Sequence, residues 1–135
     1  MGNVLYRVVK DNRVNGNGKY YGRAVQLNTV NLSSLSDIIQ RNCSMKKSDV
    51  LAVLTELVEV MQDQLQNSMT VKLDGFGSFK IGIKSKPADT AEDFTATSNI
   101  AGARVNFLPE GHKDSTSNKV TRQFLNGVTF QKYEA

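Results

Sequence analysis

The feature that most constrains the fold is a Gly-Phe-Gly corner between two short apolar runs, at residues 71–83. Gly75 and Gly77 permit backbone angles that a Cβ atom penalises, so the chain can reverse direction there. Phe76 and Phe79 are large apolar groups at the same corner, and they predict anchors for a packed core. The stretch therefore predicts two strands joined by a tight turn.

Two helices are predicted before this corner. In the first, apolar residues recur at helical spacing from Leu32 to about Asn42, with Ser33 or Ser34 as the N-cap. This spacing is typical of a short amphipathic helix that precedes a longer one.

The second helix is predicted from Met45 to about Gln66, capped by Ser44. Its apolar arc is wider than a surface helix needs. The arc contains Val50, Leu51, Val53, Leu54, Leu57, Val58, Val60, Met61 and Leu65. Two explanations remain open at this stage: a second copy of the chain covers the arc, or a broad face packs on the chain's own sheet.

Strands are predicted at both ends of the chain. Residues 4–9 and 19–27 have strand composition and predict an N-terminal hairpin around a Gly/Asn-rich turn. Residues 128–133 predict a closing strand, possible as a partner of that hairpin.

The segment after the corner is predicted as strand, excursion and strand. Strands at 70–73 and 78–83 are followed by a polar excursion and a returning strand at 103–109, which Pro109 stops. Residues 113–125 are weakly helical in pattern.

Composition limits the classes of function. The 135 residues, 39% apolar and 22% charged, suit one globular domain. The start of the chain lacks the long apolar segment of a signal peptide, and no run reaches the roughly 18 apolar residues of a membrane span. We therefore expect a cytoplasmic protein with no membrane partner.

One cysteine, Cys43, and one histidine, His112, fall short of a zinc site. Cys43 ends an apolar helical stretch and is predicted to be a buried core thiol, and His112 a solvated loop residue. The sequence therefore predicts no metal, no cofactor, no small-molecule substrate and no catalytic residues; a small hydrolase that uses carboxylates is a minor alternative without a nameable site.

Charge is unevenly distributed. The net charge is +4 and the pI about 9.3, which is compatible with nucleic acid but not diagnostic of it. Residues 1–30 hold five basic groups against one acidic, whereas residues 31–70 hold three against five. A polyanion would meet the strand-rich parts before the long helix.

The order helix, helix, strand, Gly-Phe-Gly-Ser-Phe, strand, polar excursion, strand is similar to that of bacterial HU and integration host factor proteins. The likeness runs from about Asn31 to Leu125, and its sharpest pieces are residues 44–49, 71–79 and 105–109. It implies an α+β fold of the integration-host-factor type: an intertwined homodimer with a helical base, a three-stranded sheet and a β-arm at about residues 84–104. Residues 1–30 and 126–135 would extend this core within a single domain of residues 1–135.

The resemblance also implies a function, namely an architectural, nucleoid-associated protein that binds and condenses double-stranded DNA with little sequence preference. Its contacts would be to phosphates and the minor groove. The basic residues carried over to such contacts are Lys80, Lys84, Lys86, Arg104, Lys46, Lys47, Lys113 and Lys119. Of these, Lys113 and Lys119 correspond to a basic C-terminal helix in the family.

The excursion departs from the family pattern. Arms of the family usually end in an Arg-Asn-Pro tip, whose proline wedges between base pairs, and this excursion has no such tip. In addition, its basic groups are offset by Asp89, Glu92 and Asp93. Phe94 is a possible wedge or a packing group. An alternative function is therefore a non-catalytic protein-interaction or assembly module that keeps the dimer fold without DNA binding.

Overall fold

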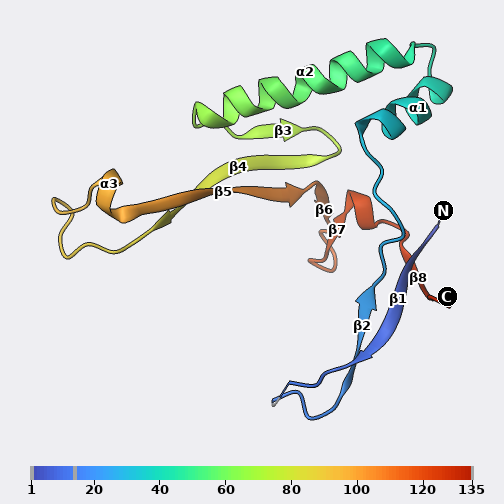
Figure 1. The fold of residues 1–135 in the computed structure, drawn as a ribbon, viewed down its shortest axis with the longest axis horizontal. Helices are drawn as coiled ribbons and strands as arrows, with labels where there is room; N and C mark the ends of the chain where they lie inside the picture. The colour runs from blue at the N-terminus through green and yellow to red at the C-terminus, as the bar shows by residue number, and fades with distance from the viewer. Residues whose placement is uncertain (1, 14, 135) are drawn as a thin grey trace.

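One of the two predicted helices, α1 (Leu32–Asn42), lies beyond the end of a three-stranded antiparallel sheet, and the other, α2 (Lys47–Gln66), lies along that sheet (Figure 1). The sheet has the order β3 (Val71–Leu73), β4 (Gly77–Ser85) and β5 (Ile100–Pro109). This computed structural model describes residues 2–13 and 15–134. The mixed α+β class is as predicted, and β5 ends at Pro109 as expected.

The Gly-Phe-Gly corner forms the turn that the sequence predicts. The Phe76 amide donates to the Leu73 carbonyl at 2.9 Å, and Gly75 and Gly77 have φ values of 80° and 153°. A Cβ at Gly77 would lie 2.5 Å from the Leu108 carbonyl oxygen on β5. Glycine is therefore required at this position both for its backbone angle and for the close approach of a neighbouring strand.

Four phenylalanines form a cluster around this corner. Phe76 lies 5.9 Å, 5.8 Å and 5.3 Å from the rings of Phe79, Phe107 and Phe124. Edge-on and tilted arrangements at these distances favour aromatic packing. The prediction of a packed core here is confirmed only in part, because Phe76 remains 43% exposed within a single chain.

The caps of the helices differ from the prediction. Asn31, rather than Ser33 or Ser34, is the N-cap of α1, and its side-chain oxygen accepts from the Ser34 amide at 2.9 Å. Asparagine stands one residue ahead of the apolar stripe, where its side chain reaches the orphan amides of the first turn.

The second helix begins at Lys47, later than predicted, and Ser44 does not cap it. Lys46 is the N-cap and makes no side-chain cap hydrogen bond. Instead, the Gln40 side chain of α1 accepts from the Lys47 amide at 2.7 Å. The cap is therefore supplied across the helix junction, which local sequence signals do not reveal.

The prediction that Cys43 is buried is wrong, because its thiol is exposed. The helix ends at Asn42, and Cys43 has an extended backbone with φ −143° and ψ 171°. This conformation takes its side chain off the apolar stripe of α1.

The two ends of the chain form a separate sheet of order β2-β1-β8, so the pairing that the sequence left open does occur (Figure 1). Its strands are β1 (Asn3–Lys10), β2 (Tyr20–Ala24) and β8 (Thr129–Lys132). β1 pairs antiparallel with β2 and parallel with β8. The hairpin and the closing strand are thereby confirmed, with β2 ending short of residue 27.

The prediction of a helix at residues 113–125 is wrong. The segment forms a hairpin of β6 (Gly111–Lys113) and β7 (Val120–Arg122), followed by the 3-10 turn η1 (Gln123–Leu125). His112 accordingly lies in an exposed strand rather than a loop.

The turn of this hairpin explains why no helix forms. The Asp114 carboxylate accepts hydrogen bonds from the Thr116 amide and hydroxyl and from the Ser117 hydroxyl. These contacts also lower the pKa of Asp114. Asp, Ser and Thr side chains compete with helical hydrogen bonds in this way, and Asn118, with φ 56°, completes the reversal.

Candidate nucleic-acid interface

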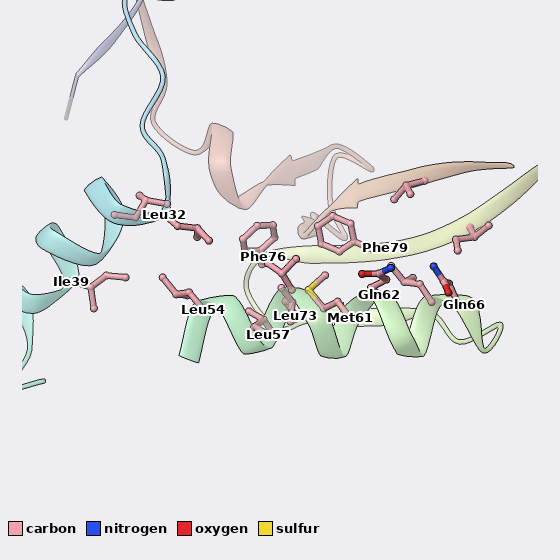
Figure 2. A pocket seen from close by; sticks show the side chains of 15 residues that line it. Leu32, Ile39, Leu54, Leu57, Met61, Gln62, Gln66, Leu73, Phe76 and Phe79 are labelled. Carbon is pink, nitrogen blue, oxygen red and sulfur yellow. The ribbon is translucent and has the colours of Figure 1, made fainter. Parts of the chain in front are cut away.

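An apolar groove opens between the helices and the sheet. Figure 2 shows side chains of α1, α2 and the corner directed into it, among them Leu54, Met61 and Phe79. The groove has a volume of about 630 Å³. Because the groove is lined by leucine, methionine and phenylalanine, the exposure of its apolar surface to water is unfavourable.

The arc of α2 stays largely uncovered in a single chain. Val53 is 60% exposed and Val58 is 55% exposed. Among the described residues, Val50 is the only hydrophobic residue that is buried. Packing on the chain's own sheet therefore does not cover the arc. Of the two explanations left open by the sequence, the structure disfavours packing on the sheet and leaves coverage by a second copy.

The total accessible surface of the chain is also larger than that of a compact monomer. The chain exposes 11277 Å², whereas a compact monomer of this mass exposes about 7,000 Å². Projecting strands account for part of the excess, and the uncovered groove accounts for another part.

The opposite face of the sheet is basic. The register pairs Lys80 with Asn106, Gly82 with Arg104, and Lys84 with Gly102. Because alternate residues of a strand point to opposite faces, Lys80, Lys84 and Arg104 share one face. The structure thus brings together three of the eight residues that the resemblance carried over.

Lys72 joins this face, and the sequence interpretation missed it. It pairs with Ser78, two residues before Lys80, and its neighbours Val71 and Leu73 point to the other side. The alternation of apolar and basic residues in this short strand is a signal that could have identified it.

Gly82 makes room on the basic face. A Cβ at this position would lie 2.8 Å from the Asn106 side-chain nitrogen and 3.5 Å from Nε of Arg104. The missing side chain leaves room for the Arg104 side chain, whose Cγ would lie 3.7 Å from an added Cβ.

The end of the arm differs in charge and structure from its base. A register irregularity falls between Lys84 and Ser85, so Lys86 lies beyond the regular ladder, although its amide donates to the Asn99 carbonyl at 2.6 Å. Residues 86–95 form a loop rather than strands, and α3 (Ala96–Asn99) follows it (Figure 1). The three carboxylates Asp89, Glu92 and Asp93 lie in this loop.

Asn99 fastens the loop to the strands. Its side chain is nearly buried, donates to the carbonyls of Lys86 and Pro87, and accepts from the Thr95 amide at 3.0 Å. The excursion therefore has a defined conformation, which places its acidic groups at the tip.

Lys46 and Lys47 lie at the α1–α2 junction, at the other end of α2 from the arm (Figure 1). Nζ of Lys47 lies 3.1 Å from Oδ1 of Asp37, and Gln40 occupies the Lys47 amide. A phosphate at this position would compete with both contacts.

Lys113 and Lys119 lie on the β6–β7 hairpin instead of a helix. Lys113 pairs with Val120, and the Lys119 carbonyl accepts from the Asp114 amide at 2.8 Å. The helix that the resemblance implied for these two residues is absent from this described segment.

Among the described residues, no group of three or more His, Cys, Asp or Glu side chains is arranged to hold a metal ion. Within the same residues, no helix is long and apolar enough to cross a membrane.

The fold and the basic face define a small α+β protein with a two-helix layer, an antiparallel sheet and a projecting two-stranded arm. The chain belongs to the HU-HIG family, described as an HU domain fused to wHTH, Ig, or glycine-rich motif, whose model matches residues 3–124. The family suggested by the sequence is thereby confirmed.

Solved structures that are similar to this chain include the following two. One is from Bacteroides vulgatus ATCC 8482 and is provisionally described as a bacterial DNA binding protein; it has a TM-score of 0.63 at 10% identity. That match covers 98% of this chain and 49% of the other, so this chain spans about half of that protein's length. At this identity the likeness shows the fold alone.

The other is an Anabaena HU–DNA cocrystal structure, with 24% identity and a TM-score of 0.41, covering 58% of this chain and 84% of that chain. No curated protein matches this chain.

Proposed function

We propose that this protein is a homodimer that binds double-stranded DNA through the basic face of its sheet. The observation that carries the proposal is the shared face of Lys72, Lys80, Lys84 and Arg104, on a sheet whose other face lines an apolar groove. Family membership supports it, because the matching family is built on an HU domain.

The groove supports the homodimer. Obligate dimers bury about 1,000–2,500 Å² per partner, and the chain's excess surface is large enough to supply that area. The exposed valines of α2 and the half-exposed Phe76 are the groups that a second copy would cover.

The chemistry of the basic face favours phosphate over bases. Lysine ammonium groups act as point charges, and an arginine guanidinium group can bind one phosphate through two parallel hydrogen bonds. Such contacts give salt-dependent binding with little sequence preference. This behaviour suits an architectural, nucleoid-associated protein of the bacterial cytoplasm that acts without catalysis, with residues 31–125 as the DNA-binding core of one domain.

The other carried-over residues have weaker support. Lys86 is the first residue of the acidic loop, and Lys47 is paired with Asp37. Lys46, Lys113 and Lys119 belong to elements away from the basic face. We propose them as secondary contacts at most.

The test is a duplex-DNA titration at several salt concentrations. The slope of log K against log salt is negative, and each lost phosphate contact reduces its magnitude by about 0.9. K80Q/K84Q should therefore reduce the slope by about 1.8, whereas R41Q/K132Q, with the same loss of charge elsewhere, should not. Absence of wild-type binding at low salt would reject the proposal.

The dimer is tested separately by sedimentation equilibrium. We expect about twice the chain mass, and a mass shift towards the monomer for Val58→Asp, which places a charge in the groove. A stable, folded wild-type monomer would contradict the dimer.

A second candidate is an assembly module that keeps the dimer and has lost DNA binding. It is favoured by Asp89, Glu92 and Asp93, which phosphate would repel from the arm's tip. A dimer by sedimentation that fails to bind duplex at low salt would establish this alternative.

A further inference from the structure

The N-terminal sheet carries two arginines directly opposite each other. Arg7 on β1 pairs with Arg23 on β2, so their Cα atoms lie about 4.5–5.5 Å apart and both side chains point to the same face. Both are exposed. Like charges in this arrangement destabilise a strand pair.

No carboxylate of the described residues lies within 4.0 Å of either guanidinium group. The acidic group of this hairpin is Asp11, and it is already engaged. Asp11 is 8% exposed and accepts from Nε and Nη2 of Arg13 and from the Tyr21 hydroxyl, at 2.8–3.0 Å. The repulsion between Arg7 and Arg23 is therefore not relieved by this part of the chain.

The arginine pair lies in the most basic part of the protein. Residues 3–24 hold five basic groups and one acidic group. The β1–β2 hairpin projects from the molecule in a direction different from that of the β4–β5 arm (Figure 1). Its positive field is therefore presented to solvent separately from the basic face of the larger sheet.

We propose that the Arg7–Arg23 face of the N-terminal sheet is a second phosphate-binding surface for duplex DNA. This inference rests on the proposed function, since it assumes that the protein binds DNA. A phosphate between the two guanidinium groups accepts hydrogen bonds from both and replaces their repulsion with attraction.

The experiment compares R7Q/R23Q with K10Q/K132Q. Both remove two positive charges from the same sheet, but Lys10 and Lys132 fall on the face opposite to Arg7 by strand alternation. We expect R7Q/R23Q to lower the salt slope for duplex binding by about 1.8, and K10Q/K132Q to change it by much less. Equal effects of the two variants would mean that only net charge matters and would overturn the proposal.

Stability without DNA provides the second measurement. Because R7Q/R23Q removes an unrelieved repulsion, its Tm should equal or exceed that of the wild type. A clear fall in Tm would show that the pair has a structural role and would overturn the inference.

The two proposals fail in distinguishable ways. If the wild type does not bind duplex, the proposed function fails and this inference fails with it. If the wild type binds, and K80Q/K84Q weakens binding while R7Q/R23Q does not, only the second surface is rejected.

Discussion

The protein presents two projecting pairs of antiparallel strands, and they differ in where their charge lies. Residues 80–104 contain four basic and three acidic groups, with the basic groups mainly at the base of the arm and the acidic groups at its tip. The β1–β2 hairpin has five basic groups against one, and that one is bound by Arg13 and Tyr21. The arm thus attracts phosphate near the body and repels it at the tip, whereas the hairpin attracts it along its length.

The two regions also differ in what fixes their position. One face of the β4–β5 arm continues into the apolar groove through Phe79, Ile81 and Val105, so folding of the core sets the direction of the arm. The hairpin is held instead by the ladder between β1 and β8. A change at the Gly-Phe-Gly corner should therefore disturb the arm and leave the hairpin largely intact.

The largest expected effect is that of Gly77→Ala. The new Cβ would meet the Leu108 carbonyl oxygen and the Phe107 ring, and φ of 153° is unfavourable for alanine. We expect a loss of about 3 kcal/mol in the free energy of unfolding, measured by urea titration. Amide exchange should accelerate in β3, β4 and β5 more than in β1 and β2.

Gly75→Ala is the matched control for this prediction. Gly75 has φ of 80° but open space around the missing Cβ. Its substitution should cost about 1 kcal/mol, from backbone strain alone. Equal costs for the two variants would show that the close approach of β5 does not matter at the corner.

The second prediction concerns the acidic tip of the arm. D89N/E92Q/D93N removes the charges that oppose phosphate, and it should raise duplex affinity about tenfold at low salt, with the gain fading as salt rises. The control E56Q/E59Q/D63N makes the same change in net charge on α2. If both triple variants raise affinity equally, the tip does not approach DNA and the contrast between the two regions loses its functional meaning.

Local pattern was sufficient to predict most of the elements. Helical spacing gave α1 and α2, and the Gly-Phe-Gly corner gave the reversal between β3 and β4, because these signals act within a few residues. Errors arose where contacts between distant or competing groups decide the outcome. Gln40 caps α2 from the preceding helix, and Asp114 organises a turn where a helix was expected.

The site was predictable to a smaller extent, because it depends on register. The sequence predicts Lys80, Lys84 and Arg104 as contacts, but their shared face follows from the pairing of Gly82 with Arg104, which the sequence does not specify. The same pairing logic adds Lys72 to the face. In the hairpin, the opposition of Arg7 and Arg23 likewise depends on a register that the long turn leaves undetermined in the sequence.

The smallest predicted effect is the titration of Asp11 in the hairpin. Hydrogen bonds from Arg13, then from Tyr21, lower the pKa of Asp11 to about 2. Because the folded pKa lies below the ordinary value of 3.8, the contribution of this carboxylate is complete above about pH 4 and is lost as the pH falls through 2. The Arg13 amide donates to Oδ1 of Asp11 at 3.0 Å, so its NMR shift should titrate near pH 2 in the wild type and not in Asp11→Asn. A midpoint close to 3.8 would show that the contacts with Arg13 and Tyr21 do not persist in solution, and the one acidic group of the hairpin would then be free to offset its basic residues.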